Sequence, residues 1–394
     1  MGLFSFFTKQ RQDEGLSLLI DVGSSSVGAS LVRIEREKPV HILTTEREDI
    51  SFQEKLSSSR FLISMNHALE NVLGKIQTKT PSIPAHIFCT LSSPWFILKI
   101  RPILISEEKP FEITESMLND FFSKDIEQLK GEFKDIPPED IEIIEKKIIQ
   151  VKLNGHEIKD PLGKITKKME LVASVAVSSR RILQSIERYV HHVFPVSSVH
   201  FGSFPVATFS AIRDIFPLNR DFLFMDITGE TTEVSIVNND ILLGNISFPR
   251  GKNFFIREIS SGLNTSNEEA ITLFGMFIHD KLDKESDMRV QKIVEQSKNE
   301  WTIFFEKALA TLSQKGSLPK MVFFTSDSDI SELFAGMVKA YESELLPNGA
   351  VLQARYFDQF IVSDFVFFET EVKRDPFLII EALFAKKLLP QILI

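Results

Sequence analysis

Cysteine is almost absent from this chain. Cys89 is the single thiol among 394 residues, so no disulfide can form within the chain. Such sparing use of cysteine is typical of proteins that work in a reducing compartment such as the cytoplasm. Cys89 lies within the apolar run 88–91, where we expect a buried strand residue and not a reactive thiol.

Long hydrophobic runs and excess positive charge are also missing. No apolar stretch approaches the roughly 18 residues that a membrane-spanning helix needs. The net charge of −9 argues against broad nucleic-acid binding, and we expect no nucleic-acid partner. Tyrosine and tryptophan are rare, with three and two residues against 35 phenylalanines. Phenylalanine must therefore supply most of the aromatic core.

What remains is an ordinary globular composition. The chain is 43% hydrophobic and 25% charged, and its length allows two or three domains with substantial cores. Period-3.6 apolar patterns and short apolar runs alternate along it, which indicates an α/β protein.

Two segments far apart in the chain share one pattern. Each is an apolar strand that reaches an aspartate, then a hydroxyl-rich turn containing glycine, then a second apolar strand. Asp21 precedes the first turn and Asp226 the second. The candidate phosphate-binding residues are Gly23, Ser24, Ser25 and Ser26 in the first turn and Gly229, Thr231 and Thr232 in the second. Backbone N–H groups and hydroxyls of such turns bind phosphate oxygens, and the two aspartates would hold Mg²⁺ through water.

The segments between and after these hairpins predict a nested domain order. A charged helix over Glu115–Lys130 and two later strands predict a strand–helix–strand–strand subdomain inserted into the first domain. The expected division is 15–91 and 175–216 for the first domain, 92–174 for the insertion, 217–253 and 319–394 for the second domain, and 254–318 for a helical subdomain.

This order resembles the bacterial actin-like proteins of the FtsA and PilM type, over nearly the whole chain. The turn from Asn154-Gly155 to Asp160–Gly163 is similar to the turn of the FtsA insertion, and Gly251 and Asn253 match a family element after the second hairpin. The resemblance implies an α/β, actin-like fold, shared with sugar kinases and heat-shock chaperones. It comprises two duplicated RNase H-like domains with an FtsA/PilM-type inserted subdomain. It also implies ATP and Mg²⁺ as cofactors, with Gly251, Asn253, Thr325 and Ser326 among the nucleotide contacts.

Three expected nucleotide contacts depart from the family pattern. Glu230 stands where the family has a phosphate-loop glycine, and its carboxylate would repel a phosphate. The turn after Thr325 lacks the family's glycines, and Ile271 and Phe274 replace polar residues of the adenine-contacting helix. We therefore leave ATP binding open and expect a slow ATPase at most. Asp21, Asp226 and Glu230 are the catalytic candidates; the alternative for Glu230 is a solvated turn carboxylate.

Three functions fit this resemblance. The first is an FtsA-like cytoplasmic scaffold in cell division, which self-assembles and couples a division filament to the membrane. The second is a PilM-like cytoplasmic adaptor that binds the tail of a pilus or secretion inner-membrane protein in a groove near the insertion. The third is an active kinase or chaperone-like ATPase, and the altered nucleotide contacts argue against it.

The two ends of the chain bear on membrane contact. The aromatic segment 1–9 fits either a frayed tail or a weak interfacial anchor for a peripheral protein at the inner face of the membrane. The apolar segment 376–394 contains two lysines and follows no flexible linker. For this segment we favour a final helix packed on the core over a membrane-binding helix.

Overall fold

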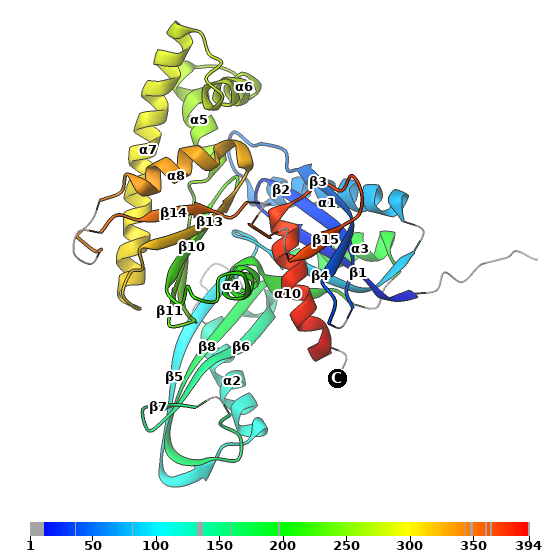
Figure 1. The fold of residues 1–394 in the computed structure, drawn as a ribbon, viewed down its shortest axis with the longest axis vertical. Helices are drawn as coiled ribbons and strands as arrows, with labels where there is room; N and C mark the ends of the chain where they lie inside the picture. Colours follow the sequence, from blue (N-terminus) through cyan, green and yellow to red (C-terminus); the bar gives the residue numbers. More distant parts are fainter. Residues whose placement is uncertain are drawn as a thin grey trace, which may run out of the picture.

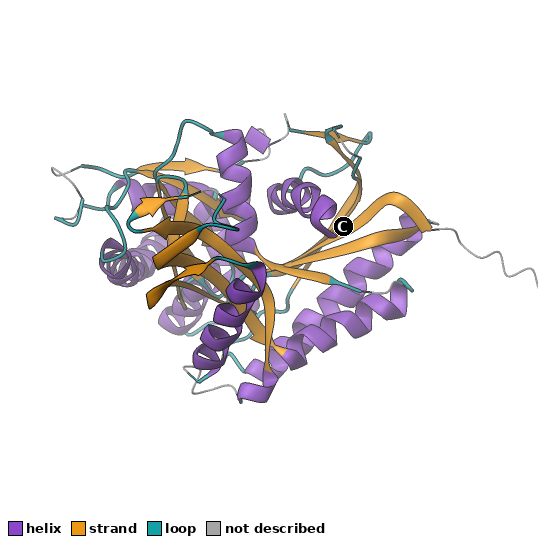
Figure 2. Ribbon diagram, turned by 90° about the horizontal axis from the view of Figure 1, so that it is seen from below, coloured by secondary structure: helices purple, strands orange, loops and turns teal. Residues whose placement is uncertain are grey.

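The computed structural model describes residues 12–35, 37–80, 82–131, 137–158, 160–195, 198–342, 344–346, 350–358, 361–362 and 365–392. They form two lobes, each built on a mixed sheet, and a third sheet that extends below both lobes (Figure 1). Helices pack on either side of the strands (Figure 2). The predicted aromatic segment 1–9 lies outside the described residues.

The first sheet has six strands in the order β15-β3-β2-β1-β4-β9. Their bounds are β1 (Gln12–Val22), β2 (Ser26–Arg33), β3 (Val40–Asp49), β4 (Ile83–Leu91), β9 (His200–Ser203) and β15 (Val366–Phe368). The central strands are buried on both faces. The covering helices are α1 (Ser58–Lys79) and α3 (Arg180–Val193) on one face and α4 (Phe204–Ile215) and α10 (Pro376–Ile392) on the other.

The second sheet has five strands in the order β12-β11-β10-β13-β14. They are β10 (Phe222–Ile227), β11 (Thr232–Asn238), β12 (Ile241–Phe248), β13 (Met321–Ser326) and β14 (Gln353–Tyr356). The helices of this lobe are α5 (Lys252–Leu263), α6 (Asn267–Ile278), α7 (Lys284–Ser313) and α8 (Ser331–Lys339). Trp301 of α7 is fully buried and lies 5.0 Å from the Phe305 ring and 5.5 Å from the Phe334 ring, centroid to centroid. Phenylalanine thus provides the aromatic core, as the composition predicts.

The same arrangement of a β-hairpin and a parallel strand lies at the centre of both sheets. β1 pairs antiparallel with β2 and parallel with β4, and β10 pairs antiparallel with β11 and parallel with β13. The two duplicated hairpins predicted from the sequence are therefore confirmed. Because each turn follows the carboxyl end of a central strand, both turns face the junction between the lobes.

The inserted subdomain is a four-stranded sheet with one helix. Its strands are β5 (Ile97–Glu112), β6 (Ile141–Leu153), β7 (His156–Glu157) and β8 (Ile165–Ser179), in the order β5-β8-β6-β7, and its helix is α2 (Glu115–Lys130). The Thr114 side chain caps α2 by accepting the Met117 N–H at 3.2 Å. Asn154 and Gly155 adopt the positive φ angles of a tight turn. The predicted order of strand, helix, strand and strand is present.

The end of the chain returns to the first lobe, which corrects the expected division of residues 319–394. β13 and β14 do join the second sheet, but β15 pairs with β3. α10 buries Leu378, Ile379 and Ile380 in the core of the first lobe. Apolar periodicity marks α10 as a packed helix, but it carries no information about which sheet the helix covers. Packing on the core, the favoured alternative for this segment, is confirmed.

Among the residues that the structure describes, no helix combines the length and hydrophobicity needed to cross a membrane.

Candidate functional site

The two hairpin turns touch each other at the junction of the lobes. The hydroxyls of Ser24 and Thr228 share a hydrogen bond of 2.6 Å, and the Glu230 N–H donates to Ser24 Oγ at 2.8 Å. A Cβ atom added to Gly229 would lie 2.9 Å from Ser25 Cβ. The space left beside the turns is a cavity of about 10 Å³, which accommodates one water molecule. A triphosphate does not fit between turns in this arrangement.

The start of α5 is bound to the second turn. The Lys252 N–H donates to the Thr228 carbonyl at 3.0 Å, and the Asn253 N–H donates to the Gly229 carbonyl at 2.8 Å. The free amides of a helix N-terminus are a common anion-binding site. Here two of these amides already have peptide partners, so they are not available to a phosphate.

Gly251 makes this contact possible, which gives a first prediction. A Cβ at Gly251 would lie 2.2 Å from the Thr228 carbonyl oxygen, whereas a Cβ at Gly275 of α6 would meet no atom within 4 Å. Gly251→Ala is therefore expected to lower the free energy of unfolding by about 2–3 kcal/mol. Gly275→Ala, the control, should be neutral or slightly stabilising because alanine favours helix. Urea unfolding of both variants tests this; equal midpoints would contradict the close packing.

Glu230 is buried and ion-paired. Its side chain is 5% exposed, so it is not the solvated turn carboxylate considered from the sequence. Both terminal nitrogens of Arg257 donate to it, at 2.8 and 2.7 Å, and the Asn253 amide donates to it at 2.8 Å. With these partners the carboxylate is neutralised and fixed, and it is not free to act as a base.

Asp21 is paired with Arg47, whose side chain is largely buried. Arg47 Nη2 donates to Asp21 Oδ2 at 2.8 Å, Nε donates to Asp375 Oδ2 at 2.6 Å, and Nη1 donates to Ser26 Oγ at 2.9 Å. Burial raises the pKa of Asp21, and Arg47 opposes this rise. Burial alone would lower the pKa of Arg47, but the two aspartates outweigh it and the pKa is raised. The guanidinium supplies the positive charge that a metal ion would otherwise bring to Asp21.

Asp226 and Glu233 lie side by side in a buried acidic row. Burial raises the pKa of Asp226 to about 7, and the Thr325 hydroxyl donates to it at 2.7 Å. Burial and the neighbouring Asp226 raise the pKa of Glu233 to about 8, and the Ser93 hydroxyl donates to it at 3.2 Å. Carboxylates bind metal ions in their deprotonated form. With a pKa of about 7, Asp226 is only about half ionised at pH 7, which weakens it as a magnesium ligand.

Three more of the predicted phosphate contacts are bound to protein groups. The Gly23 N–H donates to the Ser26 carbonyl at 3.0 Å. Thr231 Oγ1 donates to the Ser93 carbonyl at 3.0 Å. Thr232 Oγ1 donates to the Arg250 carbonyl at 2.7 Å and accepts the Trp301 indole N–H at 3.1 Å. The hydrogen-bonding groups of the turns therefore connect parts of the protein at the lobe junction.

An ion cluster lies beside Thr325 and Ser326, the residues predicted to contact the nucleoside. Lys252 Nζ lies 3.1 Å from Asp327 Oδ2 and 2.9 Å from Asp329 Oδ2. Ser326 Oγ donates to the Asp327 carbonyl at 2.9 Å. Of the family's adenine-contacting positions, Ala270 and Phe274 are packed in the second core, whereas Ile271 is exposed.

The fold thus gathers the predicted site residues, but they do not fit ATP and Mg²⁺. The hydroxyls of Ser24, Ser26, Thr231 and Thr232 all have protein partners. Among the described residues no three histidine, cysteine, aspartate or glutamate side chains group so that they could hold a metal ion.

Sequence reasoning missed the residues that close the junction, above all Arg47, Arg257 and Asp375. Arg47 and Asp375 are separated by 328 positions, so no local pattern connects them. Arg257 follows the recognised Gly251–Asn253 element by one helical turn, and that spacing was a usable signal. The ion pair between Glu230 of the second turn and Arg257 of α5 is the one of these contacts that the sequence could have suggested.

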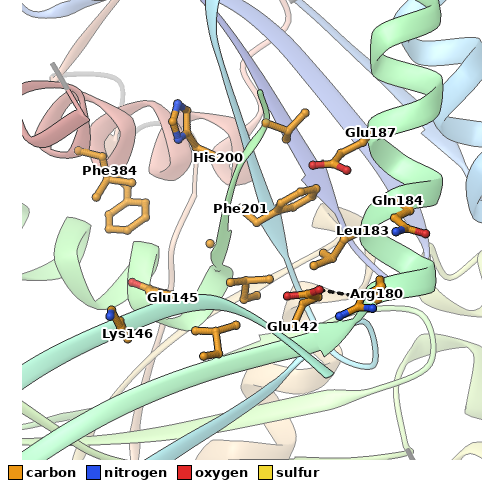
Figure 3. A pocket seen from close by; sticks show the side chains of 15 residues that line it. Glu142, Glu145, Lys146, Arg180, Leu183, Gln184, Glu187, His200, Phe201 and Phe384 are labelled. Carbon is orange, nitrogen blue, oxygen red and sulfur yellow. Dashed lines mark hydrogen bonds and ion pairs between the residues drawn. The ribbon is translucent and has the colours of Figure 1, made fainter. Parts of the chain in front are cut away.

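An open groove lies elsewhere, between the insertion and the first lobe (Figure 3). It has a volume of about 540 Å³. In Figure 3, α3 carries Arg180, Gln184 and Glu187 along one side, and Phe384 of α10 lies on the opposite side. A second hollow of about 300 Å³ continues it and shares Glu145, Lys146, Phe384 and Leu388.

Two strand edges border this groove. β9 is the last strand of the first sheet and pairs with β4 alone among the described strands. β6 pairs along its length with β8, and β7 covers its outer edge at Lys152 and Leu153. Glu145 of β6 accepts the N–H and hydroxyl of Ser203 at 3.3 and 2.9 Å, which ties the two edges together at one end.

Comparison with known proteins identifies the fold. No protein-family model matches the chain, and no curated protein sequence matches it significantly. Among solved structures, the PilM–PilN type IV pilus biogenesis complex matches with a TM-score of 0.63 and 12% identity, over 94% of this chain and 98% of that chain.

Two further structures align at lower scores. A Bacteroides thetaiotaomicron protein with actin-like ATPase fold and unknown function has a TM-score of 0.44 and 12% identity, over 97% of this chain and 99% of that chain. The activator of the 2-hydroxyisocaproyl-CoA dehydratase from Clostridium difficile, described with bound ADPNP, has a TM-score of 0.40 and 9% identity, over 96% and 97%. At these identities the likeness concerns the fold. The chain has the actin-like ATPase fold, as its paired hairpins predict.

Proposed function

We propose that this chain is a PilM-like adaptor that binds an extended segment of a partner protein, without depending on ATP hydrolysis. The observation that carries the proposal is the contrast between two hollows. The groove beside the insertion is open, at about 540 Å³, whereas the cavity between the hairpins measures about 10 Å³. In this proposal the partner is the cytoplasmic tail of an inner-membrane protein of a pilus or secretion complex, and the adaptor works at the cytoplasmic face of that membrane.

The groove favours recognition through main-chain hydrogen bonds and apolar side chains. Its exposed strand edges suit addition of a strand from a partner. Phe201, which is partly buried, offers an apolar contact, and the buried side chains of Leu183 and Phe384 form part of the groove wall. Two of its charges already have partners, because Arg180 Nε donates to Glu142 at 2.7 Å. An extended apolar peptide therefore fits this surface better than a highly charged ligand.

The FtsA-like scaffold is the weaker alternative. It requires self-assembly and contact with the membrane, and α10, the segment considered as a membrane helix, packs in the first core. An active kinase or chaperone-like ATPase requires a nucleotide, and the junction residues do not fit one. Sedimentation of the purified chain at rising concentration distinguishes the alternatives, because filaments or sheets would favour the scaffold.

A bulky residue in the groove is expected to block the partner. Gln184 is an exposed α3 residue that lines the groove, so Gln184→Trp should leave the fold intact and weaken binding at least tenfold. The probe is an array of overlapping 15-residue peptides covering the non-membrane segments of the inner-membrane proteins from the same cell. Gln291→Trp on the exposed side of α7 is the control. Equal binding by both variants, or no bound peptide at all, would overturn the proposal.

ATP is expected not to bind. Calorimetric titration of the full chain with ATP and MgCl₂ should give no saturable heat, which corresponds to a Kd weaker than about 1 mM. The reason is steric and electrostatic: the turns are in contact, and Arg47 already neutralises Asp21. Stoichiometric binding at micromolar ATP would contradict this expectation.

A further inference from the structure

We propose that Glu230 is a built-in anion, whose carboxylate takes the place of a ligand phosphate at the lobe junction and holds the lobes together. Removing this carboxylate is expected to leave a site that accepts inorganic phosphate. The proposal concerns the junction between the hairpins and does not depend on the peptide groove.

The groups around Glu230 form an anion-binding set. Both terminal nitrogens of Arg257 donate to the two carboxylate oxygens, and the Asn253 amide donates to one of them. This forked geometry is the one by which arginine recognises carboxylate and phosphate alike. The Glu230 side chain is 5% exposed and that of Arg257 is 23% exposed, so the pair is largely withdrawn from water.

The same arginine reaches the other lobe. Arg257 Nε donates to the Gln53 carbonyl at 2.9 Å, and its guanidinium lies 5.1 Å from the centre of the Phe52 ring. Phe52 follows β3 of the first sheet, yet its side chain packs against the core of the second lobe. The Glu230 backbone adds a second link, since its N–H donates to Ser24 of the first hairpin.

Glu230 therefore has two roles that a bound anion would otherwise fill. It supplies the negative charge that Arg257 and Asn253 bind, and it fixes Arg257 where that side chain bridges to Gln53. Truncation at Glu230 would leave the partly buried guanidinium of Arg257 without its counter-charge, which is unfavourable. A small tetrahedral anion can restore that charge without a covalent link to the chain.

The test is anion rescue of the full-length protein. Thermal unfolding of wild type, Glu230→Ala and Glu300→Ala is followed at constant ionic strength while potassium phosphate replaces potassium chloride. Glu300 is the matched control because it accepts two guanidinium N–H groups from Arg250, at 2.9 and 2.5 Å, but is 42% exposed. Wild type reports the general effect of phosphate on stability.

Glu230→Ala is expected to unfold several degrees below wild type and to recover most of that loss, saturably, at millimolar phosphate. Wild type and Glu300→Ala should show only a small, non-saturating rise. The double variant Glu230→Ala/Arg257→Ala should lose the phosphate response. An equal response in all proteins, or an undiminished response in the double variant, would overturn the proposal.

A second variant keeps the proposal testable where Glu230→Ala does not fold. Glu230→Gln keeps the size of the side chain and removes its charge, so the Arg257 bridge should loosen. Hydrogen exchange of the segment 50–54 is then expected to be at least tenfold faster than in wild type, with exchange in β10 unchanged. Unchanged exchange at 50–54 would refute the role of Glu230 in holding the lobes.

Discussion

Arg47→Met is expected to lower the free energy of unfolding by about 3–5 kcal/mol, which is the usual cost of removing one partner from a buried ion pair. Arg47 is 16% exposed, and its two carboxylate partners, Asp21 and Asp375, are 2% and 5% exposed. Methionine fills a similar length without a charge. Both carboxylates would then be left buried without a cation. Urea unfolding of the full chain at pH 7 measures the loss.

Two further variants identify the cause of that loss. Asp375→Asn in the Arg47→Met background removes one stranded carboxylate and should recover part of the stability. Arg220→Met is the control, because Arg220 also pairs with an aspartate, Asp240, at 2.7 Å but is 60% exposed; it should cause no measurable change. Equal losses for Arg47→Met and Arg220→Met would show that the buried position of Arg47 does not matter.

The position of Arg47 also explains how side chains of the protein itself can fill the junction between the lobes of an actin-like ATPase fold. It links Asp21 of the first hairpin to Asp375, which lies directly before α10. Two backbone N–H groups at the start of α10, those of Phe377 and Leu378, donate to the same Asp375 carboxylate, at 3.0 and 3.2 Å. The returning C-terminal helix is therefore fastened to the hairpin through one guanidinium.

The fold could be predicted where its signals are local. The turn at Gly23–Ser26 and the turn at Gly229–Thr232 are each specified by a few adjacent residues, and the insertion helix Glu115–Lys130 by its own periodicity. The return of β15 and α10 to the first sheet could not be predicted in this way. The pairing of Val366 with Val40 joins residues that are far apart in sequence, and an apolar strand of three residues is compatible with either sheet.

The location of the candidate site could be predicted, but the ion pairs and protonation of its side chains could not. The resemblance predicted that the two turns lie close together, and it identified Glu230 as a replacement for a glycine. The sequence alone does not determine whether that carboxylate points to solvent, because its orientation depends on the hydrogen bonds that it accepts from Arg257 of α5. In the same way, Asp226 and Glu233 are ordinary acids in the sequence. Burial in the folded lobe junction changes their pKa values.

Between pH 5 and pH 8 the protein is expected to become less stable as the pH rises. The pKa of Asp226 is about 7 in the fold against an ordinary 3.8, and that of Glu233 is about 8 against 4.5. The folded state therefore binds more protons than the unfolded state in this window, so deprotonation favours unfolding. Each group contributes a slope of up to about 1.4 kcal/mol per pH unit. Urea unfolding at fixed ionic strength measures it.

Amide substitution isolates these two groups. Asp226→Asn/Glu233→Gln mimics the protonated pair, so it should flatten the slope and exceed wild type in stability at pH 8. Some slope should remain, because burial also raises the pKa of Asp21 and Glu381. His86 and His200, whose pKa values burial lowers, act in the opposite direction below about pH 6.5. A double variant with the full wild-type slope would show that the acidic row is ionised in the fold, and Asp226 would again qualify as a magnesium ligand.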